Sequence, residues 1–349
     1  MTDTRTFFFT GSYTADSGGT GAGIGLLDAA VGRSLESLGT VAEASSPSFL
    51  ATHPTAPVVY AVCEFAGVLQ AYSIRDDSST GLGPALEPLG EPWTTGEAGC
   101  HVSVDPHGHY AIVTCWGDGT VLLFGLDARG GIVSRSVAPA ARDPHAHEYP
   151  VRQSRAHASL VLADGRILTT DLGLDVVRIW THDPVRGLAP AGSVTLPFGS
   201  GPRHLALHHD GRVLVVTEYS VEVFTLAPND DGGFEVRHST PAIEGGAAEG
   251  DTAAHIELSA DSTRAYVGVR GSNRIAVLSI DDDGAHPLEA SPSGGDWPRH
   301  HLVHEGLLRV AHERSNDVTT FALDAATGLI GEPLDSLEVG SPTCLVLAR

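Results

Sequence analysis

The strongest constraint on the fold of this 349-residue chain is a phrase that recurs along its whole length. Each copy has a strand-like apolar run, a turn and a second strand-like run, as in PRHLALHHDGRVLVVTEY from Pro202. Successive copies place their third core residue 52, 56, 47, 51, 45 and 44 residues apart. These seven anchor positions are Phe49, His101, His157, His204, His255, His300 and Cys344. A period of about 45–55 residues matches one four-stranded antiparallel blade.

Each repeat is expected to contain four strands, because two further alternating runs follow the phrase, with no helical period of 11 residues. The last copy, SPTCLVLAR, has only the first strand, and its missing strands are available near the N-terminus as TFFFTGSYT, GIGLLDAAV and LESLGTVAEA. We therefore expect an all-β, seven-bladed β-propeller with the last blade closed by N-terminal strands, so that no sheet edge is left open. Residues 1–349 would form a single domain. A two-sheet sandwich or two separate β domains is the alternative.

Composition excludes several kinds of function. The chain has no lysine, which excludes a Schiff-base lysine. A net charge of −22 argues against nucleic-acid or anionic-membrane partners. We see no signal peptide and no long apolar run, and the four cysteines lack paired spacing. These features favour a cytoplasmic protein, which we expect to be a monomer or homodimer.

The propeller geometry predicts where a site would lie. The first strand of each blade lines the channel and the second returns, so first-strand starts and second-strand ends meet at one mouth. Histidines at the anchors, carboxylates at second-strand ends and the arginines of the twin phrases GPRH and WPRH would gather there. The predicted substrate-binding residues are Glu64, His101, Asp171, His204, His255, Arg299 and His300. The alternative is structural: an anchor histidine can bond a neighbouring blade, and Arg203 can clamp two blades.

Several stretches carry a family resemblance: FTGSYT at Phe9, CHVSVDPHGHY at Cys100, TTDLGLDVVRIW at Thr169 and GSGPRHLALHHDGRVLVVTEY at Gly199. With VRG and WPRH, they resemble the seven-bladed lactonase family, which includes the propeller type of 6-phosphogluconolactonase and the fungal 3-carboxy-cis,cis-muconate lactonizing enzyme. In that family one His, two Arg and one Glu form the proposed active site. The resemblance implies the same catalytic roles for His157, Arg203, Glu218 and Arg270.

Two departures from the family pattern stand out. The family usually has Glu where this chain has His255, and often Asp where it has His300. The Asn that commonly precedes the second-strand Glu or Arg is replaced by Cys63, Thr217 and Val269. The mouth is therefore expected to be richer in histidine than the pattern implies.

The predicted chemistry is the opening of a lactone by water. His157 or Glu218 would act as base or acid, and Arg203 and Arg270 would hold an anionic group or the oxyanion. The substrate would be a small anionic lactone or sugar acid, with no cofactor. No nucleophile motif such as G-x-S-x-G occurs.

Three other functions remain open on the sequence. The same groups could close a lactone, as in a carboxymuconate cyclase. A ring of His157, His204, His255 and His300 could hold a metal ion. A non-catalytic propeller that binds a protein partner is the third.

Overall fold

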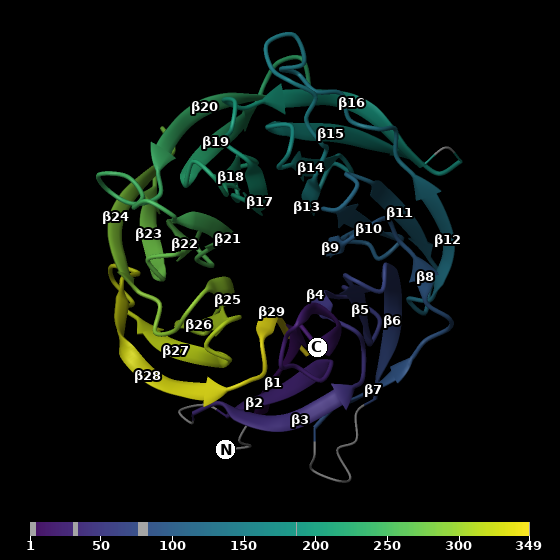
Figure 1. Ribbon diagram of the computed structural model, residues 1–349, viewed down its shortest axis with the longest axis vertical. Helices are drawn as coiled ribbons and strands as arrows, with labels where there is room; N and C mark the ends of the chain where they lie inside the picture. Colours follow the sequence, from purple (N-terminus) through teal and green to yellow (C-terminus); the bar gives the residue numbers. More distant parts are fainter. Residues whose placement is uncertain (1–4, 31–33, 76–82, 186, 349) are drawn as a thin grey trace.

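The described strands form seven sheets arranged as blades around a central channel, as the computed structural model shows (Figure 1). The structure describes residues 5–30, 34–75, 83–185 and 187–348. Within them, the one helical element is a short 3₁₀ helix, η1 (Ala15–Ser17). The predicted all-β, seven-bladed propeller is confirmed.

Each blade is antiparallel, and its first strand faces the channel. The strands, blade by blade, are β29 (Pro342–Leu347), β1 (Arg5–Ser12), β2 (Ile24–Ala30) and β3 (Glu36–Ala42); β4 (Pro47–Thr52), β5 (Val58–Cys63), β6 (Val68–Arg75) and β7 (Ala85–Pro88), with β8 (Trp93–Thr94) also on β6; β9 (Gly99–Val104), β10 (Tyr110–Cys115), β11 (Val121–Leu126) and β12 (Ile132–Val137); β13 (Ala156–Val161), β14 (Ile167–Asp171), β15 (Val176–Asp183) and β16 (Gly187–Thr195); β17 (Pro202–Leu207), β18 (Val213–Thr217), β19 (Glu222–Pro228) and β20 (Phe234–Pro241); β21 (Thr252–Leu258), β22 (Arg264–Arg270), β23 (Arg274–Ile280) and β24 (Ala285–Pro292); β25 (Pro298–His304), β26 (Leu307–His312), β27 (Asp317–Leu323) and β28 (Ile330–Glu338).

The two ends of the chain share one blade, as the truncated last repeat predicts. In Figure 1 the yellow β29 lies on the channel side of the purple β1, and the two strands pair with Phe9 opposite Val346. β1 then pairs with β2, and β2 with β3. This pairing closes the ring through hydrogen bonds, and β1 is paired on both of its edges.

The core consists of apolar layers between neighbouring blades rather than one central cluster. In one layer Leu214 and Val216 of β18 pack with Val267 and Val269 of β22. The described residues contain seven such clusters, each joining two adjacent blades. Burying one Val or Leu stabilises the fold by about 1.5–3 kcal/mol, so these layers hold the blades at fixed positions.

The strand register places the candidate residues at one mouth of the channel. β17 starts at Pro202, opposite Thr217 at the end of β18, and the pairing shifts by one residue between Pro202 and His204. Similar shifts occur at the starts of β4, β21 and β25. A bulge of this kind turns a side chain away from the regular alternation. Two consecutive residues can therefore face different parts of the channel.

In the described part of the chain, no helix is long and apolar enough to cross a membrane. All four cysteines are buried free thiols, consistent with the absence of paired spacing.

Candidate active site

A polar cavity of about 220 Å³ lies at the mouth where the inner strands begin. Its lining consists of Tyr13, Glu64, Cys100, Trp116, His157, Arg203, Glu218, Arg270 and Arg299. All four residues implied by the family resemblance are among them, with Glu64 and Arg299 from the predicted binding set. The volume is below the roughly 300–1,000 Å³ of pockets for drug-sized ligands, which suits a small metabolite.

One wall of the cavity is built from two arginines that share one carboxylate. Arg203 donates from Nε to Glu218 Oε2 at 2.8 Å, and Arg270 Nη2 lies 3.2 Å from the same oxygen. Both guanidinium groups are buried, and Glu218 is about 18% exposed. Arg203 also donates through Nη1 to the carbonyl of Ala254 in the next blade. Arg203 is thus both a clamp between blades and part of the cavity lining.

The loop before Arg203 is held by Asp175. The carboxylate of Asp175 accepts hydrogen bonds from the amides of Gly199 and Gly201, at 2.9 and 2.8 Å, and pairs with Arg152. The DLGLD and GSGPRH stretches, separated in sequence, are therefore one structural unit. Its effect is to fix the backbone that leads into Arg203.

The opposite wall is a second network of charges and a phenol. Arg299 donates from Nη1 to Glu313 at 3.0 Å and from Nη2 to the Tyr13 hydroxyl at 2.6 Å. Tyr13 in turn donates to Glu64 Oε2 at 3.0 Å. Burial raises the pKa of Tyr13 far above its usual value, so the phenol stays protonated. This network orients Arg299 toward the cavity from a blade different from those of Arg203 and Arg270.

His157 brings a neutral imidazole to the cavity. Burial, together with nearby Arg203, lowers its pKa well below the usual value. Its Nδ1 is buried and has no hydrogen-bond partner among the described residues. A neutral imidazole can take up a proton, and the lowered pKa makes His157 a weaker base than an exposed histidine.

The cavity lining is rich in arginine, although the whole chain is strongly acidic. Burial and the neighbouring Arg270 lower the pKa of Arg203 to about 10. Burial also lowers the pKa of Arg270, despite its contact with Glu218. Three arginines outnumber the two lining glutamates, so an anionic ligand would relieve the mutual repulsion.

The other predicted histidines form the floor of the channel rather than the cavity lining. His101, His204, His255 and His300 pack with Phe49, with ring centroids 4.0–5.8 Å apart. Burial lowers the pKa of His101 to about 3, and lowers the pKa of the other three as well. The two departures from the family pattern, His255 and His300, stack on each other in this floor. The floor supports the cavity, and a binding role for these rings stays a prediction.

Asp171 is placed differently from the prediction that it would bind substrate at the mouth. Its side chain is fully buried and accepts hydrogen bonds from the Ser154 hydroxyl and the amides of Arg155 and Leu174. Both carboxylate oxygens are therefore used to hold the turn after β14. Asp171 is not among the residues that line the cavity.

Tyr13, Trp116 and Cys100 line the cavity but were not among the predicted site residues. Tyr13 and Trp116 occupy the same second-strand ends as Glu64 and Glu218, so the repeat alignment contains the signal. Cys100 precedes its anchor, as Arg203 and Arg299 precede theirs.

One larger hollow, of about 500 Å³, adjoins the mouth cavity at Glu64. Two others, of about 500 and 390 Å³, lie elsewhere on the molecule. Their linings include the turns from first to second strand at 259–263 and 208–211, at the other end of the inner strands. Each of these two linings contains a single arginine, whereas the mouth cavity is lined by three.

Comparisons with known proteins agree with this geometry. The family described as "Lactonase, 7-bladed beta-propeller" matches residues 7–347. A 6-phosphogluconolactonase of Bacillus subtilis is 26% identical over 313 residues, which is 87% of this chain and 88% of that protein. A periplasmic gluconolactonase of Pseudomonas aeruginosa has the same fold, with a TM-score of 0.85, 24% identity and 99% of each chain covered. A Lactobacillus plantarum protein superposes with a TM-score of 0.86 at 22% identity, again over 99% of each chain. The chain therefore belongs to the seven-bladed β-propeller lactonase family.

Proposed function

We propose that this protein hydrolyses a small anionic sugar lactone, with 6-phosphogluconolactone as the first candidate. The observation that carries the proposal is the mouth cavity, where three buried arginines face a neutral histidine. The arginines suit a phosphate or carboxylate, and the histidine suits the activation of water. The similarity to the Bacillus 6-phosphogluconolactonase supports the choice of substrate.

In the proposed reaction His157 is the general base. Its imidazole takes a proton from water as the water oxygen attacks the lactone carbonyl. Arg203 and Arg270 stabilise the negative charge that develops on the carbonyl oxygen. When the ring C–O bond breaks, the imidazolium returns the proton to the leaving alkoxide. The product is the open-chain acid, and His157 is neutral again.

Glu218 acts in this proposal by orienting the two arginines. Its Oε2 holds one nitrogen of each guanidinium, so both groups point the same way before substrate arrives. Arg299, on the opposite wall, is well placed for the anionic tail of the substrate. No metal ion or other cofactor takes part in these steps.

The test is a substrate panel assayed by acid release with purified protein. The panel contains 6-phosphogluconolactone, unphosphorylated gluconolactone and a carboxymuconolactone, each with and without chelator. We expect the highest kcat/KM with the phosphorylated lactone, unchanged by chelator. Turnover of the carboxymuconolactone alone would favour the cyclase chemistry, since the same groups can run lactone closure. If nothing in the panel turns over, the proposal is wrong.

We further propose that the protein works in the cytoplasm, as a monomer or homodimer. Its four buried free thiols support a reducing compartment. Because the Pseudomonas relative is described as periplasmic, cell fractionation has to decide the compartment. Light scattering of the purified protein gives the number of subunits.

A further inference from the structure

Two residues interrupt the repeat with polar groups where the other copies have smaller or apolar residues. One position after the anchor the 298 copy has His301, and two positions after the anchor the 253 copy has Glu257. One position after the anchor, where the 298 copy has His301, the other six copies have Leu50, Val102, Ala158, Leu205, Ile256 and Leu345. Two positions after the anchor, where the 253 copy has Glu257, the other six copies have Ala51, Ser103, Ser159, Ala206, Leu302 and Val346. The fold therefore does not itself need a histidine or a glutamate at these places.

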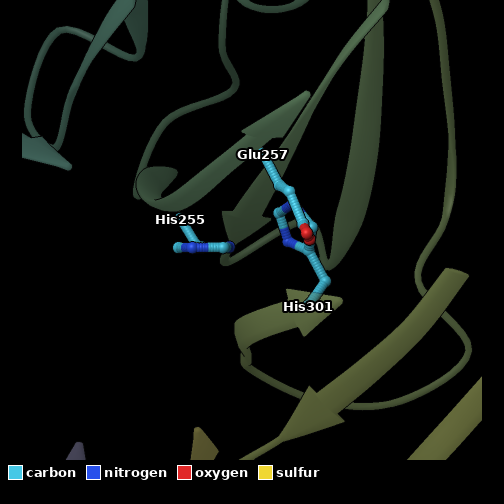
Figure 2. A group of neighbouring side chains, drawn as sticks. All are labelled: His255, Glu257 and His301. Atoms are coloured by element: carbon cyan, nitrogen blue, oxygen red, sulfur yellow. The ribbon is translucent and has the colours of Figure 1, made fainter. Parts of the chain in front are cut away.

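The structure brings these two exceptions together with a third group, His255. Their potential ligand atoms all lie within 4.8 Å of one another. His255 and Glu257 are two residues apart on β21, and His301 comes from β25 of the next blade. Figure 2 shows the three side chains converging across the boundary between the two blades. Among the described residues, these three form the one group of His, Cys, Asp or Glu side chains whose possible metal-ligand atoms all lie this close together.

The histidine nitrogens that face the group are unused. His301 is about 1% exposed, and its Nε2 lies 3.0 Å from the carbonyl of Tyr266. A carbonyl can only accept, so Nε2 carries the proton and Nδ1 carries the lone pair. This Nδ1 and the Nδ1 of His255 are buried without a hydrogen-bond partner in the described residues. A backbone carbonyl that fixes the tautomer is the usual outer partner of a metal-bound histidine.

Glu257 supplies a carboxylate to the same place. Its Oε2 accepts the amide of Val303 at 2.9 Å, which fixes the side chain across the blade boundary. Burial raises the pKa of this carboxyl to about 8. A β-carbon at Gly268 would lie 3.2 Å from the carbonyl of Pro298, so glycine at this position eases the close approach of β22 and β25 beside the cluster.

We propose that His255, Glu257 and His301 bind one divalent transition-metal ion of the Zn²⁺ class between β21 and β25. Two imidazoles and one carboxylate suit such an ion, with solvent at the remaining position. Tetrahedral ligation at about 2.1 Å needs donor atoms about 3.4 Å apart, so small side-chain rotations close the site. None of the three residues lines the mouth cavity. The site is therefore separate from the proposed reaction and joins two blades.

The test uses Zn²⁺ and Co²⁺ as probes on full-length protein freed of metal by chelator and dialysis. Two variants restore what other repeats contain: His301→Leu, as at Leu50, Leu205 and Leu345, and Glu257→Ala, as at Ala51 and Ala206. Because the fold already accepts these residues at equivalent positions, both variants should fold. The matched control is His101→Phe, which copies Phe49 at the equivalent anchor; the rings that His101 contacts are those of Phe49 and His204, not of a proposed ligand.

We expect calorimetry to give one Zn²⁺ per wild-type chain, and Co²⁺ to give a tetrahedral visible spectrum. The affinity should fall at least ~100-fold in His301→Leu and Glu257→Ala, more than loss of an outer partner causes. His101→Phe should bind Zn²⁺ as the wild type does. Zn²⁺ at about 100 times its Kd should raise the wild-type Tm by roughly 4 °C, and that of the two ligand variants by less.

Three results would overturn the proposal. One is the absence of stoichiometric Zn²⁺ binding in the wild type. Another is equal affinity in the wild type and His301→Leu. The last is loss of Zn²⁺ binding in His101→Phe, which would place the ion among the other anchor histidines. Lactonase activity enters none of these outcomes, so failure of the proposed reaction does not affect them.

Discussion

Replacing Glu218 by Gln tests whether the two-arginine wall does the chemistry that we propose. Glu218 holds Arg203 at 2.8 Å and Arg270 at 3.2 Å through one oxygen. Glutamine keeps the size of the side chain but removes its charge. Its carbonyl oxygen can take the place of the shared Oε2, but that oxygen carries no negative charge. The two arginines then repel each other without a counter-charge.

The cost in stability follows from the burial of these groups. Removing one partner of a buried ion pair costs about 3–5 kcal/mol. Glu218 is about 18% exposed, which places the loss near 3 kcal/mol. For 349 residues the unfolding entropy is about 0.7 kcal/mol per degree, so Tm should fall by about 4 °C. The protein remains folded at 25 °C, and its turnover can be measured there.

The turnover should fall by at least ~100-fold, because misdirected arginines no longer stabilise the oxyanion. The assay is acid release from 6-phosphogluconolactone at 25 °C with saturating substrate. Glu313→Gln is the matched control: Glu313 pairs with Arg299 at 3.0 Å, is about 20% exposed and does not line the cavity. It should lose similar stability and less than tenfold in turnover. Equal losses of turnover in the two variants, or a Glu218→Gln variant within tenfold of the wild type, would refute the argument.

Three further predictions follow from single residues. Asp171→Asn should lower the free energy of unfolding, measured in urea, by about 1–3 kcal/mol, because the oxygens of Asp171 hold the turn after β14. The KM should not change. A raised KM would show that Asp171 contributes to substrate binding. Trp297 has a φ of 70°, where glycine is favoured, and its ring lies 5.1 Å from the Arg270 guanidinium. Trp297→Gly should therefore remove backbone strain of about 1 kcal/mol while lowering kcat/KM, and an unchanged kcat/KM would show that Arg270 does not need the ring. The wild type should lose stability as the pH falls below about 6.5, because His101 has a pKa of about 3 when folded and the unfolded chain binds more protons. His101→Phe, which copies Phe49, should reduce the loss between pH 7 and pH 5 by up to about 2 kcal/mol in urea titrations, and an identical slope in both proteins would contradict this cause.

The fold could be predicted from the sequence because its repeat has one strong, local signal. Anchors such as His204 and His255 recur with a blade-sized period, and every copy carries alternating apolar residues on both strands. The truncated copy at Cys344 required its missing strands from elsewhere, and the phenylalanines of β1 supplied the only matching pattern that we identified.

The division between cavity and floor could not be predicted, because it depends on the local geometry at the start of each inner strand. The sequence aligned His157 with His101 and His204, yet only His157 lines the cavity. The pairing shifts at the start of β9, β13 and β17 alike, yet Cys100 and Arg203 line the mouth from the position before the anchor and His157 lines it from the anchor itself. Alternation along a strand does not reveal such a shift.

Asp171 illustrates a second limit, which concerns side-chain hydrogen bonds. It occupies the same second-strand end as Glu64 and Glu218, so the repeat treats the three alike. The shorter side chain bonds instead to Ser154 and two backbone amides of its own turn. Aspartate often satisfies nearby backbone donors in this way, whereas glutamate reaches further.

The structure also explains why arginine, rather than any other cation, suits the wall of this cavity. Arg203 donates from Nε to Glu218 and from Nη1 to the carbonyl of Ala254, so two separate partners fix one planar group. The guanidinium still has Nη2 for a ligand, because its five donors point in different directions. A lysine has a single nitrogen on a flexible stem, and it could not hold the blade boundary, the carboxylate and an anion in these directions together. The contacts that join the blades at Arg203 therefore also set the direction of its charge, and a rigid ring of blades becomes a preorganised anion site.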